Sequence, residues 1–260
     1  MRILAVGDVC YSAGVKTALR VLPTLKREKG IDLIIVNGEN SADGNGITPQ
    51  SADMLFAAGA DVITGGNHTL RRREVHTLLD ENRYLLRPHN IDAKYGTGYC
   101  LIDMGRCQTA VINLSGQVYL ESQKAQNPFL AADMLIERAK SDGARLIFVD
   151  FHAEATSEKR ALGLYLDGRV SAVFGTHTHV QTADAQILPK GTGYITDLGM
   201  TGVVNSVLGV KSEIIIGRLK DGNMAKFEQE DTGESALSGC VFDVDIKSGL
   251  TNGVEAIYIK

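Results

Sequence analysis

The sequence predicts an α/β fold in which short buried strands alternate with helices. Short apolar runs recur along the chain, and the segment between the first two runs spaces its apolar residues as a helix does. A cluster of polar residues follows directly after each of these early runs. Because open parallel sheets bind ligands beyond the carboxyl ends of their strands, these clusters predict a site at one edge of a sheet.

The strands of the first part of the chain are predicted from apolar runs that are too short to be buried helices. These runs cover residues 3–6, 31–36, 61–64, 146–149 and 170–174. Alternating segments on both sides of Met104-Gly105-Arg106 predict a hairpin over residues 96–113. From residue 183 the pattern is β-rich and predicts strands at 186–188, 193–197, 214–216, 240–245 and 254–259. The last two are expected to form an antiparallel pair.

Helices are predicted where apolar residues recur at helical spacing, over residues 15–29, 49–58, 71–86, 131–140 and 162–167. Pro23 is expected to kink or divide the first helix. Thr48 followed by Pro49 predicts the start of the second helix, and Gly59 predicts its end. Arg71–Arg73 would begin the third helix, where positive charge opposes the macrodipole. This run is either a solvated charge run or a contact surface for a phosphate-bearing substrate or RNA.

The composition excludes several classes of protein. The net charge of −4 lacks the basic footprint of a protein that coats nucleic acid. No run of about eighteen apolar residues and no signal peptide is present, so we expect no membrane contact. The four cysteines are scattered without a Cys-x-x-Cys pair and predict reduced thiols in a cytoplasmic protein. With no linker, repeat or low-complexity segment, residues 1–260 are expected to form one domain.

Side chains that bind metals or transfer protons are concentrated in the clusters after the strands. They are Asp8, Glu39, Asn40, Asn67, His68, His152, His177 and His179. Taken alone, Asp8 is also explained as a helix cap or turn residue. The repetition of such clusters after successive strands argues against coincidence. Four of the six histidines of the chain lie in them.

Gly175-Thr176-His177-Thr178-His179 is the densest of these clusters. Alternate residues of a strand point to the same face, so His177 and His179 would leave the strand on the same side if the extended geometry persisted. Two imidazoles at this spacing suit one metal ion or two neighbouring ions. Taken alone, the pair is explained equally well as a coincidence at a strand end.

The candidate side chains combine carboxylate, amide and imidazole groups. This mixture suits manganese, iron, zinc or magnesium, and the lack of cysteine ligands argues against a structural zinc site. The set is larger than one ion needs, so a pair of ions bridged by a carboxylate would use it economically. Two-ion sites are typical of phosphoryl transfer.

The order of motifs along the chain resembles the calcineurin-like metallophosphoesterase superfamily. Asn-Gly-Glu-Asn at residues 37–40, where most members have Gly-Asp, is similar to the YmdB-like family of phosphodiesterases. Further matching stretches are residues 59–64, 150–159, 175–184 and 194–202. The resemblance covers nearly the whole chain. It implies a metallophosphoesterase-type β-sandwich core flanked by helices, with the metal site at the carboxyl ends of the strands.

The resemblance also implies a role for each candidate residue. One ion would be held by Asp8, Glu39, Asn40 and His179. The second would be held by Asn67, His152, His177 and the bridging Glu39, and His68 would be the general acid. The ions would be divalent or mixed-valence, with iron or manganese favoured and magnesium or zinc as alternatives. Cys10 stands where the wider superfamily has a histidine and is an alternative ligand.

The sequence departs from the family after Gly-Asn-His-Thr, where the family usually has a tryptophan. Here Leu70 and the run Arg71–Arg73 follow. We expect this segment to change the range of substrates rather than to abolish activity, because the metal ligands are untouched.

Three functions are consistent with these patterns. The resemblance implies a metal-dependent phosphodiesterase that hydrolyses 2′,3′-cyclic nucleotides through a metal-bound hydroxide. A broad-range phosphomonoesterase is the first alternative. The second is a regulator that binds RNA or a protein partner and has incidental activity. A pure binding module has no need of His68 beside Asn67, which favours the enzymatic readings.

Overall fold

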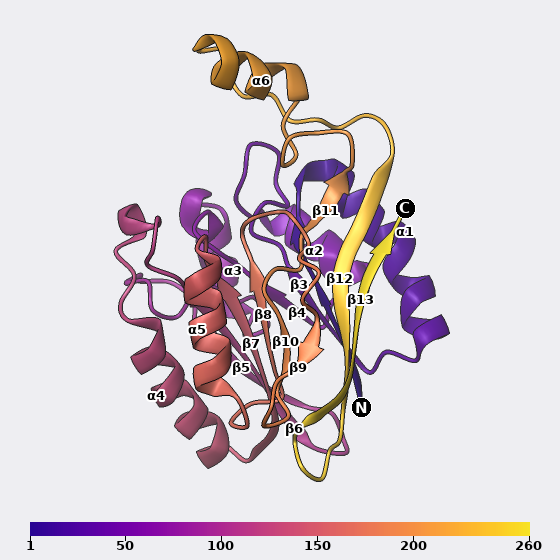
Figure 1. Ribbon diagram of the computed structural model, residues 1–260, viewed down its shortest axis with the longest axis vertical. Coiled ribbons are helices and arrows are strands. Elements are labelled where there is room, and N and C mark those ends of the chain that lie inside the picture. The colour runs from indigo at the N-terminus through magenta and orange to yellow at the C-terminus, as the bar shows by residue number, and fades with distance from the viewer.

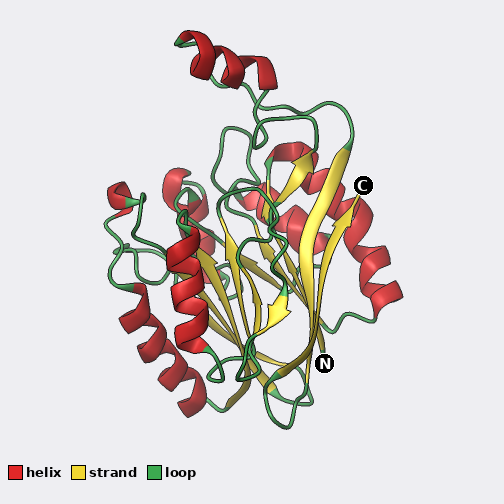
Figure 2. Ribbon diagram, in the orientation of Figure 1, coloured by secondary structure: helices red, strands yellow, loops and turns green.

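Two mixed β-sheets packed face to face, with helices on both outer faces, make up the body of the protein (Figure 1). The computed structural model describes residues 1–260. Figure 2 shows the strands gathered in the centre and the helices outside them. The α/β fold predicted from the sequence is therefore confirmed, and the sheets are mixed rather than purely parallel. No helix is long and apolar enough to span a bilayer.

The first sheet contains strands from both ends of the chain. Its strands are β1 (Arg2–Val6), β2 (Asp8–Val9), β3 (Leu33–Asn37), β4 (Val62–Thr64), β11 (Met200–Val203), β12 (Ser235–Val244) and β13 (Thr251–Ile259). The order is β2-β11-β12-β1-β3-β4, and β13 pairs with β12. Strands β1, β3 and β4 are parallel, while β12 runs antiparallel to β1 and to β13. The predicted antiparallel pair at the end of the chain is therefore confirmed.

The second sheet comes from the middle of the chain. Its strands are β5 (Tyr99–Asp103), β6 (Gln108–Ser115), β7 (Ala144–His152), β8 (Ala172–Thr176), β9 (Gln186–Ile187) and β10 (Gly193–Ile195). The order is β5-β6-β7-β8-β10-β9. The four central strands are parallel, and β5 and β9 run antiparallel at the two edges. The pairing of β5 with β6 confirms the predicted hairpin.

Side chains alternate between two cores along the central strands. In β1, Ile3 and Ala5 lie in the core between the sheets, whereas Leu4 and Val6 pack toward helices. The period of two residues in an extended strand produces this division. Burial on both faces explains why these strands are continuous apolar runs in the sequence.

Five of the six helices cover the outer faces of the sheets. The helices are α1 (Tyr11–Lys29), α2 (Pro49–Ala57), α3 (Val75–Glu81), α4 (Pro128–Ser141), α5 (Thr156–Leu166) and α6 (Ser212–Asp221), with 3-10 turns η1 (Thr69–Arg71) and η2 (Glu121–Gln123). Apolar residues of α1, α2 and α3 pack on the first sheet, and those of α4 and α5 pack on the second. Helix α6 covers neither sheet and projects from one end of the molecule (Figure 1).

The start of α2 confirms the capping prediction. The Thr48 side chain accepts a hydrogen bond from the Ser51 backbone N–H, and the Ser51 hydroxyl accepts one from the Thr48 N–H. Pro23 does not divide α1, which continues as one helix to Lys29. Leu22 and Leu25 are buried on both sides of this proline, so packing holds the helix together across it.

The predicted helix over residues 71–86 is too long at both ends, because the helix ends at Glu81. Helix α3 begins only at Val75, and the arginine run lies before it. The Arg72 guanidinium donates to the backbone carbonyls of Asp43 and Asn45 instead of lying in a first helical turn. The expected conflict with the helix macrodipole therefore does not arise.

The predicted strand at Ile214–Ile216 is also wrong, because these residues belong to α6. A short run of β-branched residues does not separate a strand from a helix by periodicity alone. The end of this helix is set by Gly222, which adopts a left-handed φ of 69°.

Candidate functional site

The strand ends bring all the predicted site residues to one edge of the two-sheet body. From the first sheet, β2 carries Asp8, the turn after β3 carries Glu39 and Asn40, and the turn after β4 carries Asn67 and His68. From the second sheet, β7 ends at His152 and the turn after β8 carries His177 and His179. Side chains of the two sheets touch here, as the following distances show.

Glu39, His152 and His177 form a compact cluster at the junction of the sheets. Their ligand atoms all lie within 4.8 Å of one another. His152 Nε2 is 3.3 Å from Glu39 Oε2 and 3.0 Å from His177 Nδ1. The Asn67 Oδ1 atom is 2.9 Å from the same His152 nitrogen. One carboxylate, one amide and two imidazoles thus converge on a single point.

A second group, formed by Asp8, Asn40 and His179, lies beside this cluster. His179 Nε2 is 3.7 Å from Asp8 Oδ1 and 3.3 Å from Asn40 Nδ2. The Asn40 amide also donates to Glu39 Oε1 at 2.9 Å. Glu39 therefore contacts members of both groups, one through each of its carboxylate oxygens.

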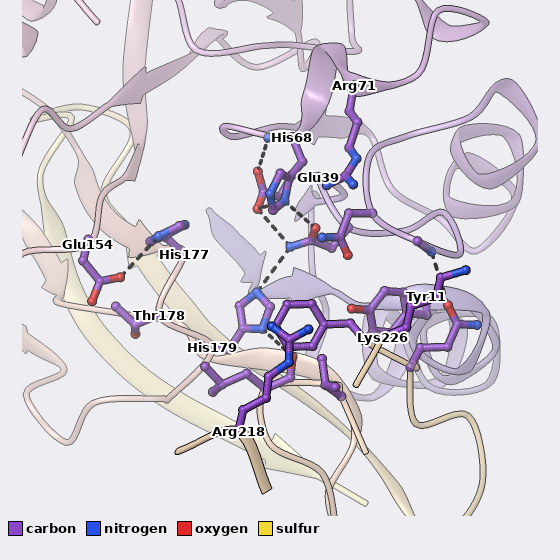
Figure 3. A pocket seen from close by; sticks show the side chains of 17 residues that line it. Tyr11, Glu39, His68, Arg71, Glu154, His177, Thr178, His179, Arg218 and Lys226 are labelled. Carbon is purple, nitrogen blue, oxygen red and sulfur yellow. Dashed lines mark hydrogen bonds and ion pairs between the residues drawn. The ribbon is translucent and has the colours of Figure 1, made fainter. Parts of the chain in front are cut away.

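His68 lies at the rim of these two groups and faces the pocket (Figure 3). Its Nδ1 atom is 2.9 Å from Asn40 Oδ1 and 3.5 Å from Glu39 Oε1. Its backbone N–H donates to Glu39 Oε2. The side chain is 29% exposed, whereas Glu39 is buried. With Nδ1 bonded to Asn40, the Nε2 atom of His68 is left for a ligand.

The expectation of extended geometry through the two last histidines is wrong. Strand β8 ends at Thr176, and His177 and His179 have left-handed φ values of 103° and 63°. Both rings nevertheless reach the site because the turn is tied down. The His177 N–H donates to Asp8 Oδ2, and the Thr178 N–H donates to Asp197 Oδ2. These bonds offset the cost of the left-handed conformation.

The electrostatics of the cluster follow from burial and from the pairing of Glu39. Burial disfavours a charge on His152, but the charge and hydrogen bond of Glu39 outweigh it and raise the pKa of His152 to about 9. Burial would raise the pKa of Glu39, yet His152 and His68 hold it well below its usual range. Burial, aided by the neighbouring His152, lowers the pKa of His177 to about 3.

Asp8 provides the most direct test of whether a cation fits this site. Its side chain is fully buried, and its Oδ1 atom has no hydrogen-bond partner. Burial raises the pKa of this carboxyl group, because desolvation disfavours its charge. Oxygen and imidazole donors beside an unpartnered buried carboxylate are what a hard or borderline divalent ion needs. The residues therefore fit a metal.

A layer of buried polar residues beneath the cluster was not predicted. Asp150 accepts hydrogen bonds from the hydroxyls of Thr64 and Thr176 and from the Asn37 amide. The Thr176 hydroxyl also lies 2.9 Å from His152 Nδ1, which fixes the orientation of that ring. The sequence did contain a signal for Asp150, because this residue directly follows the predicted strand at residues 146–149 and lies two residues before His152.

A buried ion pair supports the turn that carries the two last histidines. Lys159 Nζ, from α5, lies 2.5 Å from Asp197 Oδ2, and their side chains are 1% and 0% exposed. Asp197 also accepts from the backbone N–H groups of Thr178 and Gly199. Lys159 acts on the site only through Asp197, so it is a positioning residue. Sequence reasoning missed Lys159 because lysine is normally exposed and because the predicted helix began only at residue 162.

Gly66 is required by the closeness of the two sheets. A Cβ atom at this position would lie 2.1 Å from Glu39 Oε2 and 2.3 Å from His152 Nε2. No side chain fits there without moving the cluster.

Cys10, the alternative ligand, lies next to the site. Its Sγ atom is 3.7 Å from His179 Nδ1, and burial raises the pKa of the thiol well above its ordinary value. His76 and His89 lie elsewhere: the His76 ring stacks on Tyr95, and His89 follows Pro88 in a loop.

A pocket of about 970 Å³ opens over the cluster (Figure 3). One side is formed by the predicted site residues Glu39, Asn40, His68, His177 and His179. The opposite side is formed by residues 205–233, which we call the arm and which include α6. The arm contributes Leu208, Val210, Arg218, Lys226, Phe227 and Gln229 to the pocket wall. Sequence reasoning missed this wall because it placed a strand in the arm.

Fold and site together define a class of protein: an α/β sandwich of two mixed sheets that carries a histidine- and carboxylate-rich cluster where its parallel strands end. The chain belongs to the YmdB-like family, whose model matches residues 4–257. The family expected from the motifs is thus confirmed.

Relatives of known name or structure match the chain over its full length. A Bacillus subtilis (strain 168) protein named 2′,3′-cyclic-nucleotide 2′-phosphodiesterase is 45% identical over 261 residues, covering 100% of this chain and 97% of that protein. A crystal structure of a novel phosphatase from Mycoplasma pneumoniae has a TM-score of 0.93 at 36% identity, covering 100% and 93% of the two chains. A hypothetical protein from Thermus thermophilus has a TM-score of 0.91 at 36% identity, covering 99% and 98%.

Proposed function

We propose that this protein is a metal-dependent phosphodiesterase that opens 2′,3′-cyclic nucleotides. The observation that carries the proposal is that buried Glu39 and His152 meet the half-buried His177 beside an Asp8 oxygen without a hydrogen-bond partner, at the base of an open pocket. The name of the Bacillus subtilis relative, 45% identical over its full length, supplies the substrate class.

The proposed ligands divide into two sets that share Glu39. Asp8, Asn40 and His179 would complete one set, and Asn67, His152 and His177 the other. The support for this division is that Glu39 lies within 3.3 Å of His152 through Oε2 and bonds Asn40 through Oε1. Iron or manganese suits these oxygen and imidazole donors best, with magnesium or zinc as alternatives.

Two ions at this site would polarise the phosphoryl oxygens and lower the pKa of a water molecule. The protein side chains supply position and protons. Attack of the water oxygen on phosphorus forms one P–O bond, and the bond from phosphorus to the 2′ oxygen breaks. His68 would donate the proton that the departing 2′ oxygen needs, since it lines the pocket and Asn40 orients its ring through Nδ1.

A phosphomonoesterase is the second candidate, because the structure of the Mycoplasma pneumoniae relative is described as a novel phosphatase. The same donors would serve both reactions. The two reactions differ in their products. Opening a cyclic phosphodiester leaves the 2′ oxygen and the phosphate on the same nucleotide, whereas a phosphomonoester releases inorganic phosphate. The donor residues alone do not decide between these substrates.

The test is the initial rate of 2′,3′-cyclic AMP hydrolysis with added manganese, measured with and without a chelator. We expect a chelator-sensitive rate and a nucleoside monophosphate as product. Nucleoside monophosphates are offered as parallel substrates, and release of inorganic phosphate at a higher kcat/KM would favour the monoesterase.

The matched variants are His68→Ala and His76→Ala. Loss of a general acid costs about 10²- to 10⁴-fold in rate, so His68→Ala should lose activity in this range while its metal content stays the same. His76→Ala, remote from the pocket, should keep the full rate. Metal-loaded protein that turns over no cyclic nucleotide would contradict the proposal.

A further inference from the structure

Three cationic side chains in the pocket wall have no acidic partner. Arg71 comes from η1 in the body, and Arg218 and Lys226 come from the arm. None of the three makes an ion pair, although other lysines and arginines of the chain do. The carboxylates that line the same pocket are already engaged: Glu39 with His152 and His68, and Glu154 with His177.

Arg218 is held in place on an aromatic ring. Its guanidinium carbon lies 3.9 Å from the centroid of Phe227, and its Nε and Nη2 atoms donate to the Ala225 carbonyl. Phe227 is 55% exposed although it lines a pocket. A flat cation stacked on an exposed ring offers a surface on which a nucleobase can stack.

The arm is attached to the body where it faces the pocket. The Gly44 backbone N–H donates to Gln229 Oε1, and Val210 pairs with Gln229 within the arm. Figure 3 shows Arg71 near His68, and Arg218 and Lys226 nearer to His179. The three cations therefore line the same pocket as the proposed reacting centre.

A cyclic mononucleotide would leave these three cations without a ligand. It has a single phosphate, and that phosphate would lie on the ligand cluster with His68. The pocket volume of about 970 Å³ is at the upper end of the range for drug-sized ligands, so space remains beyond one nucleotide. Unpaired cations beside that space fit a second phosphate.

We propose that the wall formed by Arg71, Lys226 and the Arg218–Phe227 stack binds the nucleotide that precedes the cyclic phosphate, so that the preferred substrate is an RNA end rather than a free mononucleotide. This inference rests on the proposed phosphodiesterase function. Lys226 and Arg71 would contact the preceding internucleotide phosphate, and the stack would contact its base.

The test compares three substrates: 2′,3′-cyclic AMP, the diadenosine ribonucleotide ending in a 2′,3′-cyclic phosphate, and the same dinucleotide with an uncharged methylphosphonate linkage. We expect the charged dinucleotide to have a kcat/KM about tenfold or more above that of cyclic AMP, through a lower KM. The uncharged linkage should lose most of this gain. Equal kcat/KM values for all three would overturn the proposal.

The variants are Lys226→Gln and Arg71→Gln, with Lys220→Gln as the control because Lys220 is an exposed lysine of α6 that does not line the pocket. Each of the first two should lower kcat/KM on the charged dinucleotide about five- to tenfold more than on cyclic AMP. Equal losses on both substrates would mean that these cations serve the reacting phosphate, which contradicts the inference.

A binding measurement separates this inference from the phosphodiesterase proposal. The affinities of adenosine 3′-monophosphate and of diadenosine ending in a 3′-phosphate are measured by calorimetry on the metal-loaded protein. Tighter binding of the dinucleotide that is lost in Lys226→Gln supports the proposed role of the wall, even if no hydrolysis occurs. Equal affinities would refute it even if cyclic AMP is hydrolysed.

Discussion

The strand-end edge and the arm lie on opposite sides of one pocket but are built in opposite ways. At the edge, Asp8, Glu39 and His152 are fully buried, and Asp150 beneath them is bonded to three neighbours. In the arm, no residue of α6 is buried, and Leu219 is 85% exposed. The edge is part of the packed body, whereas the arm meets it through a few polar contacts.

The two regions differ because their proposed roles need different degrees of positional precision. Ligand atoms must be fixed within fractions of an ångström, and buried, fully bonded networks provide that precision. Contacts to a variable part of a substrate need less precision and can lie on an exposed segment supported by a rigid scaffold. Changes of the same type should therefore have very different effects in the two regions.

The largest difference in stability between the two regions is expected when a lysine is replaced. Lys159→Met leaves the buried Asp197 charge without its partner, and breaking a buried pair in this way costs about 3–5 kcal/mol of unfolding free energy. Because Asp197 also holds the Thr178 N–H, bound metal should fall as well. Lys211→Met in the arm breaks only the exposed pair with Glu228 and should leave the midpoint of urea unfolding unchanged. Equal midpoints for the two variants would mean that Lys159 does not hold Asp197.

Replacing a glycine by alanine should have opposite effects on stability in the two regions. Gly66→Ala places a Cβ atom 2.1 Å from Glu39 Oε2, and such overpacking costs about 1–3 kcal/mol. At Gly217, inside α6, the nearest atom to an added Cβ is 3.8 Å away, so alanine should stabilise that helix by roughly 0.5–1 kcal/mol. Thermal unfolding and metal analysis of both variants check this. A Gly66→Ala protein with a normal metal content would show that the cluster can move to make room.

The smallest effect is expected from removal of α6. Replacing residues 212–221 by a glycine-serine linker should change the unfolding free energy by less than about 1 kcal/mol, since no side chain of this helix is buried. The pH dependence of metal binding should also stay as it is in the intact protein. A protein that no longer folds after this exchange would show that the arm is part of the core.

The sequence predicts the edge better than the arm for a physical reason. Buried parallel strands must be apolar, so their ends are easy to locate, and Asp8, Glu39 and His152 follow those ends directly. The conformation of His177 and His179 could not be predicted, because left-handed φ values at residues other than glycine depend on bonds from distant positions such as Asp8 and Asp197. In the arm, Ile214–Ile216 form no buried face, so the apolar run that suggested a strand carried no information about packing.

The division of the proposed ligands between two sheets has a consequence for the order of assembly. Asp8, Glu39 and Asn67 lie in or just after strands of the first sheet, and His152, His177 and His179 lie in or just after strands of the second. If these residues are the ligands, neither sheet alone presents the complete set, and high-affinity loading would wait until the two layers have docked. Metal binding would then be a late step of folding that stabilises the docked sheets. The bound ion would slow the separation of the two sheets and would not guide their formation.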